Sequence, residues 1–304
     1  MSYIHLNDYK MHDTCIAFGH FDGLHIGHME VLSVLKEREK SGLTSIMLQL
    51  EDPELFLASK CLTTPDENRY ILKDNTPQVI IAHPLTVSSS NIEPEEFITN
   101  LLLNKMGART IVAGANCRFG KDGRGDAQLL SEFAEIYDFE AHIVDTVYEG
   151  DNIITSDIIR SDLESGNLAW ANQRLGYRYS LRGRVIPGNE ANFRARMPTV
   201  TMQPHASKLI PAHGVYATIT KVDGEHFYGL TNIGLRPSIG DLEHVTIETF
   251  IPNFDRNIHG KAVETQLCLY VRETRKFGSL NEVRAQIDLD LEQVRTHFDR
   301  NWSA

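Results

Sequence analysis

Cysteine is scarce in this sequence, and no two cysteines stand at the spacing of a metal site. The four are Cys15, Cys61, Cys117 and Cys268. Zinc sites and disulfide frameworks usually show closely spaced cysteines, so this pattern argues against both. We expect four reduced cysteines that pack in the core as small apolar side chains.

Long apolar runs and a surplus of positive charge are also missing. No run approaches the roughly 18 apolar residues that span a bilayer, and the N-terminus lacks the layout of a signal peptide. Lys and Arg number 30 against 41 Asp and Glu, a net charge of −11. This balance argues against a broad surface for nucleic acid or membranes. We therefore expect a cytoplasmic protein with small-molecule partners, whose oligomeric state the sequence leaves open.

The 304 residues are enough for two domains, each with its own core. Over roughly the first 180 residues, apolar segments typical of strands alternate with segments of helical period. Strands are predicted at 14–18, 43–48, 78–82, 110–113 and 139–147, and helices at 29–40, 64–73, 94–106, 127–137, 156–164 and 168–175. This alternation predicts an α/β fold with a parallel sheet, in which ligands bind at the carboxyl ends of the strands.

The pattern changes near residue 180, where short strands separated by Gly, Pro, Asp and Asn replace the helices. Strands are predicted at 179–186, 214–221, 226–231, 245–251 and 263–271. They predict a small antiparallel β-barrel. A C-terminal helix follows, with a capping box at Ser279 and Glu282 and with core positions Val283, Ile287, Leu291 and Val294. We therefore place one domain at residues 1–180 and a second at residues 181–304.

The stretch Gly19–His28, between the first strand and the first helix, has the composition of a phosphate site. Free N–H groups and the dipole at a helix N-terminus favour an anion by roughly 0.3–1 kcal/mol per charge. The three glycines allow a tight turn close to a ligand, and His25 and His28 can direct ring N–H groups into one cleft. Such a pair would stabilise charge on a polyphosphate, whereas a lone histidine there would more often be a cap or a buried side chain.

The same stretch resembles the HxGH signature of the nucleotidyltransferase superfamily. Its longer form, Gly-x-Phe-Asp-Gly-x-His-x-Gly-His, is similar to the opening of prokaryotic FAD synthetases. The shorter signature also suits phosphopantetheine and glycerol-phosphate transferases and class I aminoacyl-tRNA synthetases. The Phe-Asp-Gly insertion narrows the choice, and no Lys-Met-Ser-Lys-like element of a class I synthetase accompanies it. The resemblance implies a Rossmann-like nucleotidyltransferase domain at the N-terminus.

The resemblance also implies roles for individual residues of the first domain. The catalytic residues would be His25, His28 and Arg160, and the nucleotide-binding residues would be Gly19, Phe21, Asp22, Gly23, Gly27, Asn116, Thr155 and Ser156. Hydroxyls at a helix start also act as caps, and the same free N–H groups serve a cap and a phosphate. Two residues depart from the family pattern: Cys117 replaces the usual Phe, and Asp157 puts a negative charge where the family has a hydroxyl.

The second domain resembles the riboflavin kinase module of bifunctional FAD synthetases. The resemblance rests on residues 214–217, 231–238, 248, 260–261 and 276–277. It implies that Glu248 takes the proton of the ribityl hydroxyl. It also implies a kinase-like site with Thr199, Thr201 and Asn232, in which Thr199 would be a Mg²⁺ ligand.

One motif of this kinase module is altered. The family's Pro-Thr-Ala-Asn motif here has Thr201 in the place of Asn, and residues 188–197 lack the glycines with which the family wraps a phosphate. Phosphoryl transfer depends on positioning and charge neutralisation. We therefore predict that the kinase is weak or absent.

Taken together, these motifs predict an FMN adenylyltransferase that uses Mg²⁺ and makes FAD and pyrophosphate from ATP and FMN. Two alternatives stay open. A fully bifunctional enzyme would also phosphorylate riboflavin, and a non-catalytic flavin or nucleotide sensor would explain the altered residues 157 and 201 together. The intact pair of His25 and His28 favours the enzyme, because a binding protein has little need for two histidines at a phosphate.

Overall fold

The computed structural model describes residues 10–51, 53–58, 60–72, 77–187, 199–237, 243–275 and 277–301. It divides into two compact units, Met1–Ile158 and Ile159–Ala304. The division falls within helix α7 (Ser156–Glu164), whereas the composition changes near residue 180. The domain boundary at residues 180 and 181 therefore stays a prediction.

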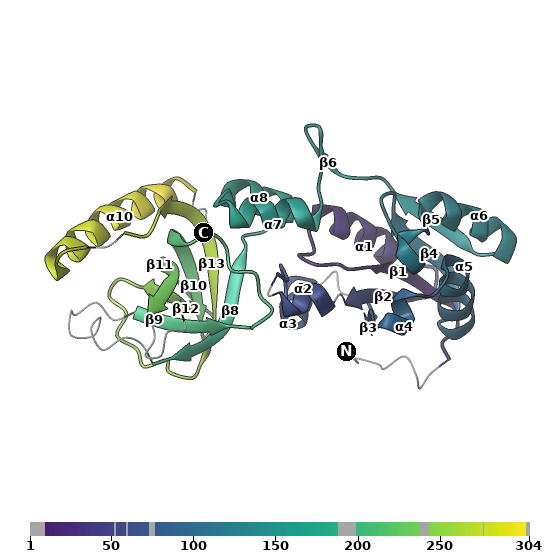
Figure 1. Ribbon diagram of the computed structural model, residues 1–304, viewed down its shortest axis with the longest axis horizontal. Helices are drawn as coiled ribbons and strands as arrows, with labels where there is room; N and C mark the ends of the chain where they lie inside the picture. The colour runs from purple at the N-terminus through teal and green to yellow at the C-terminus, as the bar shows by residue number, and fades with distance from the viewer. Residues whose placement is uncertain are drawn as a thin grey trace. The chain divides into compact units, whose positions relative to one another are not determined.

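The first unit contains a five-stranded parallel sheet, as the alternation of strands and helices predicts (Figure 1). The strand order is β3-β2-β1-β4-β5, so β1 lies in the middle of the sheet. The strands are β1 (Thr14–Gly19), β2 (Thr44–Glu51), β3 (Val79–Pro84), β4 (Ala108–Gly114) and β5 (Glu140–Val144). A short antiparallel hairpin follows, formed by β6 (Tyr148–Glu149) and β7 (Asn152–Ile153).

Helices cover both faces of this sheet. They are α1 (Ile26–Glu39), α2 (Pro53–Leu57), α3 (Pro65–Leu72), α4 (Val87–Ser90), α5 (Pro94–Glu96), the π-helix η2 (Phe97–Lys105), the 3₁₀ turn η3 (Lys121–Gly123) and α6 (Ala127–Tyr137). The helix predicted at 94–106 is confirmed, although only its first turn is α-helical and the rest has π geometry. Hydropathy reports a buried helical face and carries little information on the hydrogen-bond register that separates the two helix types.

Strand β1 is buried on both faces, which explains its continuous apolar sequence. Ile16 and Phe18 pack with residues of η2 and α6 in one core cluster. Cys15 and Ala17 pack on the other face with residues of α1 and α3. The carboxyl end of this central strand therefore leads into the turn with the two histidines from a rigid position.

The second unit contains a closed antiparallel barrel with strand order β10-β11-β12-β9-β8-β13, which confirms the predicted barrel. Its elements are α8 (Leu168–Leu175), β8 (Ser180–Ile186), β9 (Thr199–Pro204), β10 (Gly214–Val222), β11 (Glu225–Pro237), β12 (Glu243–Phe250), β13 (Ala262–Arg272) and α10 (Leu280–Asn301). The predicted capping box is confirmed in part: the Glu282 N–H donates to Ser279 Oγ at 3.3 Å, whereas the Glu282 carboxylate accepts the N–H of Gly278 at 3.0 Å.

Helix α10 lies along the outer face of the barrel, where it is drawn in yellow in Figure 1. Val294 and Phe298 of α10 are buried against Val215, Ala217 and Leu230 of the barrel. The inward face includes a row of buried, hydrogen-bonded hydroxyls of Thr218, Thr231 and Thr249 beside apolar side chains. The apolar outer face of β10 and β11 thus belongs to the interface with the C-terminal helix.

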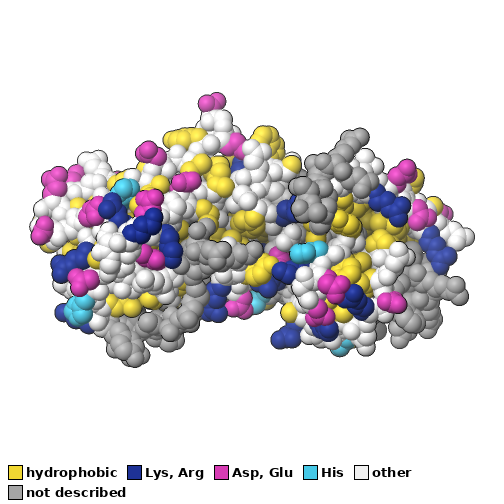
Figure 2. Space-filling model, turned by 180° about the vertical axis from the view of Figure 1, so that it is seen from behind, with side chains coloured by type: hydrophobic (Ala, Val, Ile, Leu, Met, Phe, Trp, Pro, Cys, Tyr) yellow, Lys and Arg dark blue, Asp and Glu magenta, His cyan; other side chains and the backbone are white. Residues whose placement is uncertain are grey.

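The surface carries interspersed charges on the face drawn in Figure 2, with Lys and Arg next to Asp and Glu. In the described part of the chain, no helix combines the length and the hydrophobicity that crossing a membrane requires. All four cysteines are free, as their spacing indicates.

Candidate functional site

The two histidines of the turn lie together at the N-terminus of α1. His25 is the N-cap residue, and its Nδ1 accepts the backbone N–H of His28 at 3.3 Å. The two rings are stacked, with centroids 3.7 Å apart and planes at 19°. The capping bond and the ring stacking both occur in the first turn of α1. The HxGH spacing therefore places both imidazoles beside the end of β1.

Burial keeps both imidazoles neutral near pH 7. It lowers the pKa of His25 to about 4. Burial, reinforced by His25 and His20 nearby, also holds the pKa of His28 well below its usual value. The Nδ1 atom of His28 is buried without a hydrogen-bond partner among the described residues. Such rings act as neutral donors of an N–H group and add no positive charge.

We expect the stability of the first unit to fall at acid pH because of His25. The unfolded chain binds a proton near pH 6.5, whereas the folded chain resists it down to about pH 4. Stability is thus lost as the pH falls through this window, by roughly 3 kcal/mol for this residue. His25→Asn keeps an N-cap acceptor and removes the titration, so urea unfolding between pH 7 and pH 4 should show a smaller loss for the variant. Equal losses of stability in the variant and in the unaltered chain would contradict the low pKa assigned to His25.

The backbone of the turn uses one of its three glycines for a left-handed conformation. Gly23 has φ +83°, but the other positive values belong to Phe21 at +48° and Leu24 at +40°. Gly27 is instead a position without room for a side chain, because a Cβ there would lie 3.2 Å from the His25 ring. Of the three glycines, only Gly23 thus adopts a positive φ, and their close approach to a ligand stays a prediction. Two buried non-glycine residues hold strained conformations, as often occurs at functional sites.

Asp22 fastens the histidine turn to a distant loop. Its carboxylate accepts the N–H groups of Leu62 and Thr63, both at 3.1 Å, and the side chain is buried. The Thr63 hydroxyl in turn accepts the Gly23 N–H at 2.8 Å. The structure thus gives Asp22 a role in holding the loop, and its predicted contact with a nucleotide stays a prediction.

The hydroxyls after the hairpin reach the same turn. Thr155 caps α7 by accepting the Ile158 N–H at 3.3 Å, which confirms the predicted cap. The Ser156 hydroxyl donates to the Asp22 carbonyl at 2.8 Å, so this helix start lies beside the histidine turn. Arg160 is buried on the part of α7 that belongs to the second unit, and its role beside the histidines stays a prediction.

Asn116 is exposed on the loop that follows β4. The Ala115 N–H donates to the Val144 carbonyl at 2.8 Å, which ties this loop to the end of β5. A buried side chain, Phe119, holds the rest of the loop edge-on against Phe18, with ring centroids 5.5 Å apart. Asn116 therefore stands at the same edge of the sheet as the histidines, on an anchored loop. Its contact with a nucleotide stays a prediction.

Replacing Gly125 in this loop should loosen the anchor. The backbone of Gly125 exchanges two hydrogen bonds with Phe119, and a Cβ at Gly125 would lie 2.4 Å from the Phe119 ring. Overpacking of this kind costs about 1–3 kcal/mol. Gly125→Ala should therefore lower the urea midpoint of the first unit. Gly123→Ala is the control, because its Cβ would meet Arg118 at 3.5 Å and only the φ of +62° is strained. Equal effects in both variants would argue against the anchor.

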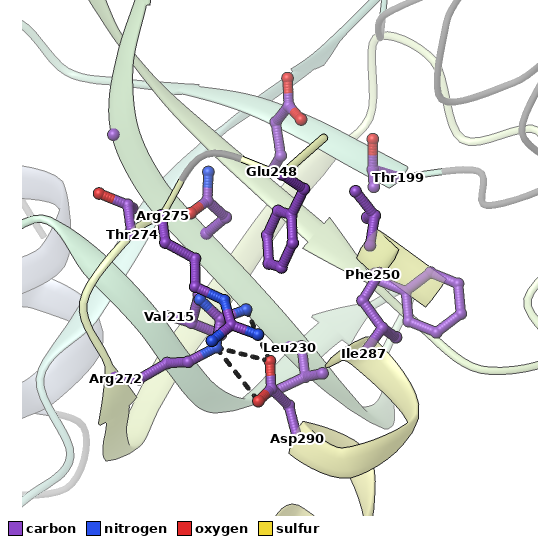
Figure 3. A pocket seen from close by; sticks show the side chains of 14 residues that line it. Thr199, Val215, Leu230, Glu248, Phe250, Arg272, Thr274, Arg275, Ile287 and Asp290 are labelled. Atoms are coloured by element: carbon purple, nitrogen blue, oxygen red, sulfur yellow. Dashed lines mark hydrogen bonds and ion pairs between the residues drawn. The ribbon is translucent and has the colours of Figure 1, made fainter. Parts of the chain in front are cut away.

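The second unit has a cavity of about 540 Å³ between the outer face of the barrel and α10 (Figure 3). Thr199, Asn232 and Glu248 line it, so three predicted residues of the kinase-like site meet in one place. Asn232 lies directly opposite Glu248, and Glu248 opposite Thr201, on neighbouring strands. The Thr201 hydroxyl is buried without a hydrogen-bond partner in the described part of the chain. Pro198 and residues 188–197 lie outside the described residues.

Sequence reasoning missed an ion pair in the same cavity. Arg272 of β13 donates to both carboxylate oxygens of Asp290 of α10, at 2.8–3.2 Å. Asp290 follows Ile287 by three residues and Val283 by seven, so it lies on the apolar stripe of the helix. A charged residue at helical spacing from the predicted core positions Val283 and Ile287 was the available signal. Among the described residues, no cluster of three or more His, Cys, Asp or Glu could hold a metal ion.

Comparison with known proteins agrees with one candidate site in each of the two units. The sequence model of FAD synthetase matches residues 8–158, and that of riboflavin kinase matches residues 175–298. A bifunctional riboflavin kinase/FMN adenylyltransferase of Buchnera aphidicola is 31% identical over 297 residues, which cover 94% of this chain and 95% of the relative. A protein of the same name from Listeria monocytogenes is 30% identical over 290 residues, covering 93% and 92%.

A solved structure is similar over both units. It is described as a macrolide-efflux protein from Streptococcus pneumoniae. The TM-score is 0.86 at 26% sequence identity, and the match covers 98% of this chain and 97% of the other. The chain and these relatives therefore share their length as well as their order of domains.

Proposed function

The chain belongs to the family of bifunctional riboflavin kinase/FMN adenylyltransferases, and on that premise we propose that it makes FAD and pyrophosphate from FMN and ATP. Family membership makes it a nucleotidyltransferase enzyme. The observation that carries the proposal is the stacked pair of His25 and His28 at the N-terminus of α1. Free N–H groups at the same helix end favour the phosphates of ATP.

The proposed reaction needs no catalytic base. A phosphate oxygen of FMN attacks the α-phosphorus of ATP, the bond from that phosphorus to the bridging oxygen breaks, and pyrophosphate leaves. The phosphate of FMN is already ionised near pH 7, because its second pKa is about 6. The protein therefore contributes placement of the two phosphates and stabilisation of charge on the α- and β-phosphates.

Neutral histidines are suited to stabilising charge on the α- and β-phosphates. Two imidazole N–H groups can donate to the transferring phosphate oxygens without taking a proton near pH 7, because burial keeps their pKa values low. Ser156 and Thr155 lie at a helix start next to the turn and would bind neighbouring phosphates through free N–H groups. Arg160 would add the positive charge that the histidines lack. The negative charge of Asp157 would repel these phosphates, so we expect its side chain to point towards Mg²⁺ or water.

Mg²⁺ fits the oxygen-rich residues of the second unit. This ion is usually held by one or two protein oxygens together with phosphates of the substrate. The Thr199 hydroxyl lines the cavity and is an oxygen ligand of that kind. Bound there, Mg²⁺ would neutralise charge on the phosphates of ATP.

Phosphorylation of riboflavin is the second candidate function, favoured by the cavity that Glu248, Asn232 and Thr199 line. In this reaction Glu248 would take the proton of the ribityl hydroxyl as it attacks the γ-phosphorus of ATP, and ADP would leave. The replacement of Asn by Thr201 in the motif keeps our prediction of a weak kinase. The family relationship supports the bifunctional enzyme equally well.

Two parallel incubations separate these functions. The full chain is supplied with ATP and Mg²⁺ and, in parallel, with riboflavin or FMN, and the products are analysed for FMN, FAD, ADP and pyrophosphate. FAD from FMN alone supports a transferase with an inactive kinase. FAD from both flavins supports the bifunctional enzyme, and tight flavin binding without any product would support the sensor.

A further inference from the structure

The turn between β1 and α1 contains a third histidine, His20, that the proposed function does not use. It directly follows the last residue of β1, and its side chain is exposed. Its Nδ1 lies 3.1 Å from the Leu50 carbonyl of β2. The register of the sheet explains this contact, because Gly19 of β1 lies opposite Gln49 of β2 and the next residues of the two strands are neighbours. His20 is thereby held on the β2 side of the turn.

The contact with Leu50 decides which ring nitrogen of His20 is available to a ligand. A carbonyl oxygen only accepts hydrogen bonds, so Nδ1 carries a hydrogen and donates it. The other nitrogen, Nε2, has no hydrogen-bond partner in the part of the chain that the structure describes. Nε2 accepts a hydrogen bond when the ring is neutral and donates one when the ring is protonated. The turn therefore carries an exposed imidazole that is anchored at one nitrogen and available at the other.

The two sides of the turn are expected to bind different substrates. Strand β1 lies between β2 and β4 in the sheet. Of the predicted nucleotide-binding residues, Asn116 follows β4, and Thr155 and Ser156 follow β5 and the hairpin, so these three come from the β4 side. In an in-line displacement the attacking and the leaving oxygen lie on opposite sides of the phosphorus. The attacking phosphate of FMN is therefore expected on the β2 side, opposite the pyrophosphate of ATP.

We propose that His20 binds the phosphate of FMN through Nε2, on the β2 side of the turn. This inference rests on the proposed synthesis of FAD from FMN and ATP. When the ring is protonated, Nε2 donates its N–H to the phosphate dianion. When the ring is neutral, Nε2 takes the proton of the phosphate monoanion, and the result is the same pair of imidazolium and dianion. His20 thus supplies beside the nucleophile the positive charge that the neutral His25 and His28 lack.

This pair makes His20 a specificity-determining residue. Riboflavin ends in a hydroxyl where FMN carries its phosphate, so riboflavin gains no ion pair from the imidazole. A hydrogen bond between two charged groups is about twice as strong as one between neutral groups. The contribution of His20 should therefore appear in KM for FMN and leave KM for ATP unchanged.

A kinetic test separates the two ring nitrogens of His20 by substitution. In His20→Asn the amide takes the place of Nδ1 and keeps a donor for the Leu50 carbonyl, but no group reaches the place of Nε2. We expect KM for FMN in FAD formation to rise at least about tenfold, with KM for ATP within about twofold. His20→Gln, whose amide reaches the place of Nε2, should recover part of the loss. An unchanged KM for FMN in a folded His20→Asn variant, or an equal rise of both KM values, would overturn the inference.

A second measurement does not depend on turnover. Diethyl pyrocarbonate modifies exposed imidazoles, and peptide mass mapping of the full chain gives the rate at each histidine. FMN at about ten times its dissociation constant should slow the modification of His20 about tenfold, whereas riboflavin should not. His12, which is exposed in the same unit, is the control and should react at the same rate with either flavin.

The outcomes of this mapping decide the inference separately from the proposed function. Protection of His20 by ATP and not by FMN would assign the residue to the nucleotide and overturn the inference. Equal protection by FMN and riboflavin, or none by FMN, would overturn it as well. If the chain makes no FAD, the proposed function fails, while protection of His20 by FMN alone would still support the phosphate site.

Discussion

His28→Ala is expected to lower kcat for FAD formation from FMN and ATP by two to three orders of magnitude. The substitution removes a preorganised N–H donor, and the loss of one such donor typically costs about 3–4 kcal/mol in the transition state. The ring also stacks on His25 at 3.7 Å, so its removal frees the second donor to turn away. Single-turnover rates at saturating FMN and ATP measure this effect without interference from product release.

His12→Ala provides the control for this prediction. His12 is an exposed histidine of the same unit, before the amino end of β1, whereas the candidate site follows the carboxyl end of that strand. Its removal should leave the rate within a factor of two, an approximate bound for surface changes. A folded His28→Ala variant with near-normal FAD formation would show that the site is wrongly assigned.

Asp22→Ala should destabilise the first unit by about 3–4 kcal/mol, the largest change in stability that we expect for a single residue of the turn. The substitution leaves the N–H groups of Leu62 and Thr63 buried without an acceptor, and each unsatisfied group costs about 1–3 kcal/mol. The freed loop would also release the Thr63 hydroxyl from Gly23. Urea unfolding at pH 7 measures the change, and KM for ATP should rise in the fraction that stays folded.

Arg109→Ala is the matched control. Arg109 forms an ion pair with Asp13 at 3.1 Å, and the two side chains are 69% and 65% exposed. Exposed pairs contribute at most about 1 kcal/mol, so the control should unfold near the midpoint of the unaltered chain. If Asp22→Ala behaved like Arg109→Ala, the carboxylate would not hold the loop.

Local patterns in the sequence predict most of the fold. The apolar segment that becomes β1 is recognisable as a short continuous apolar run, and the segment that becomes α1 is recognisable because its buried residues Val31, Leu32 and Leu35 recur at helical spacing. The spacing of His25 and His28 also predicts that they meet at a helix start, and the cap and the stack bear this out. These relations join residues that are close in the chain.

The features that the sequence did not reveal depend on short or altered segments. Strand β9 (Thr199–Pro204) was missed because Pro198 and Pro204 flank it, which is typical of a loop. The hairpin of β6 and β7 has two residues in each strand, too few for a period to show. The strand predicted at 139–147 is therefore too long, and the structure ends it at Val144.

Contacts between residues far apart in the chain are the second group of features that the sequence did not predict. The Asp22 carboxylate meets Leu62 and Thr63 some 40 residues later, and nothing local indicates this choice. The register of the barrel likewise decides that Arg272 shares a row with Glu248. Such pairings follow from the tertiary fold, so they become visible only when the strands are placed beside each other.

Transfer of the α-phosphorus of ATP tests the central proposal most directly. The full chain is incubated with FMN, Mg²⁺ and ATP labelled at either the α- or the γ-phosphorus, and the flavins and pyrophosphate are separated and counted. Adenylyl transfer at the histidine turn predicts α-label in FAD, γ-label in pyrophosphate, and equal amounts of the two products. Absence of α-label from the flavin fraction, with FMN recovered unchanged, would contradict the proposal.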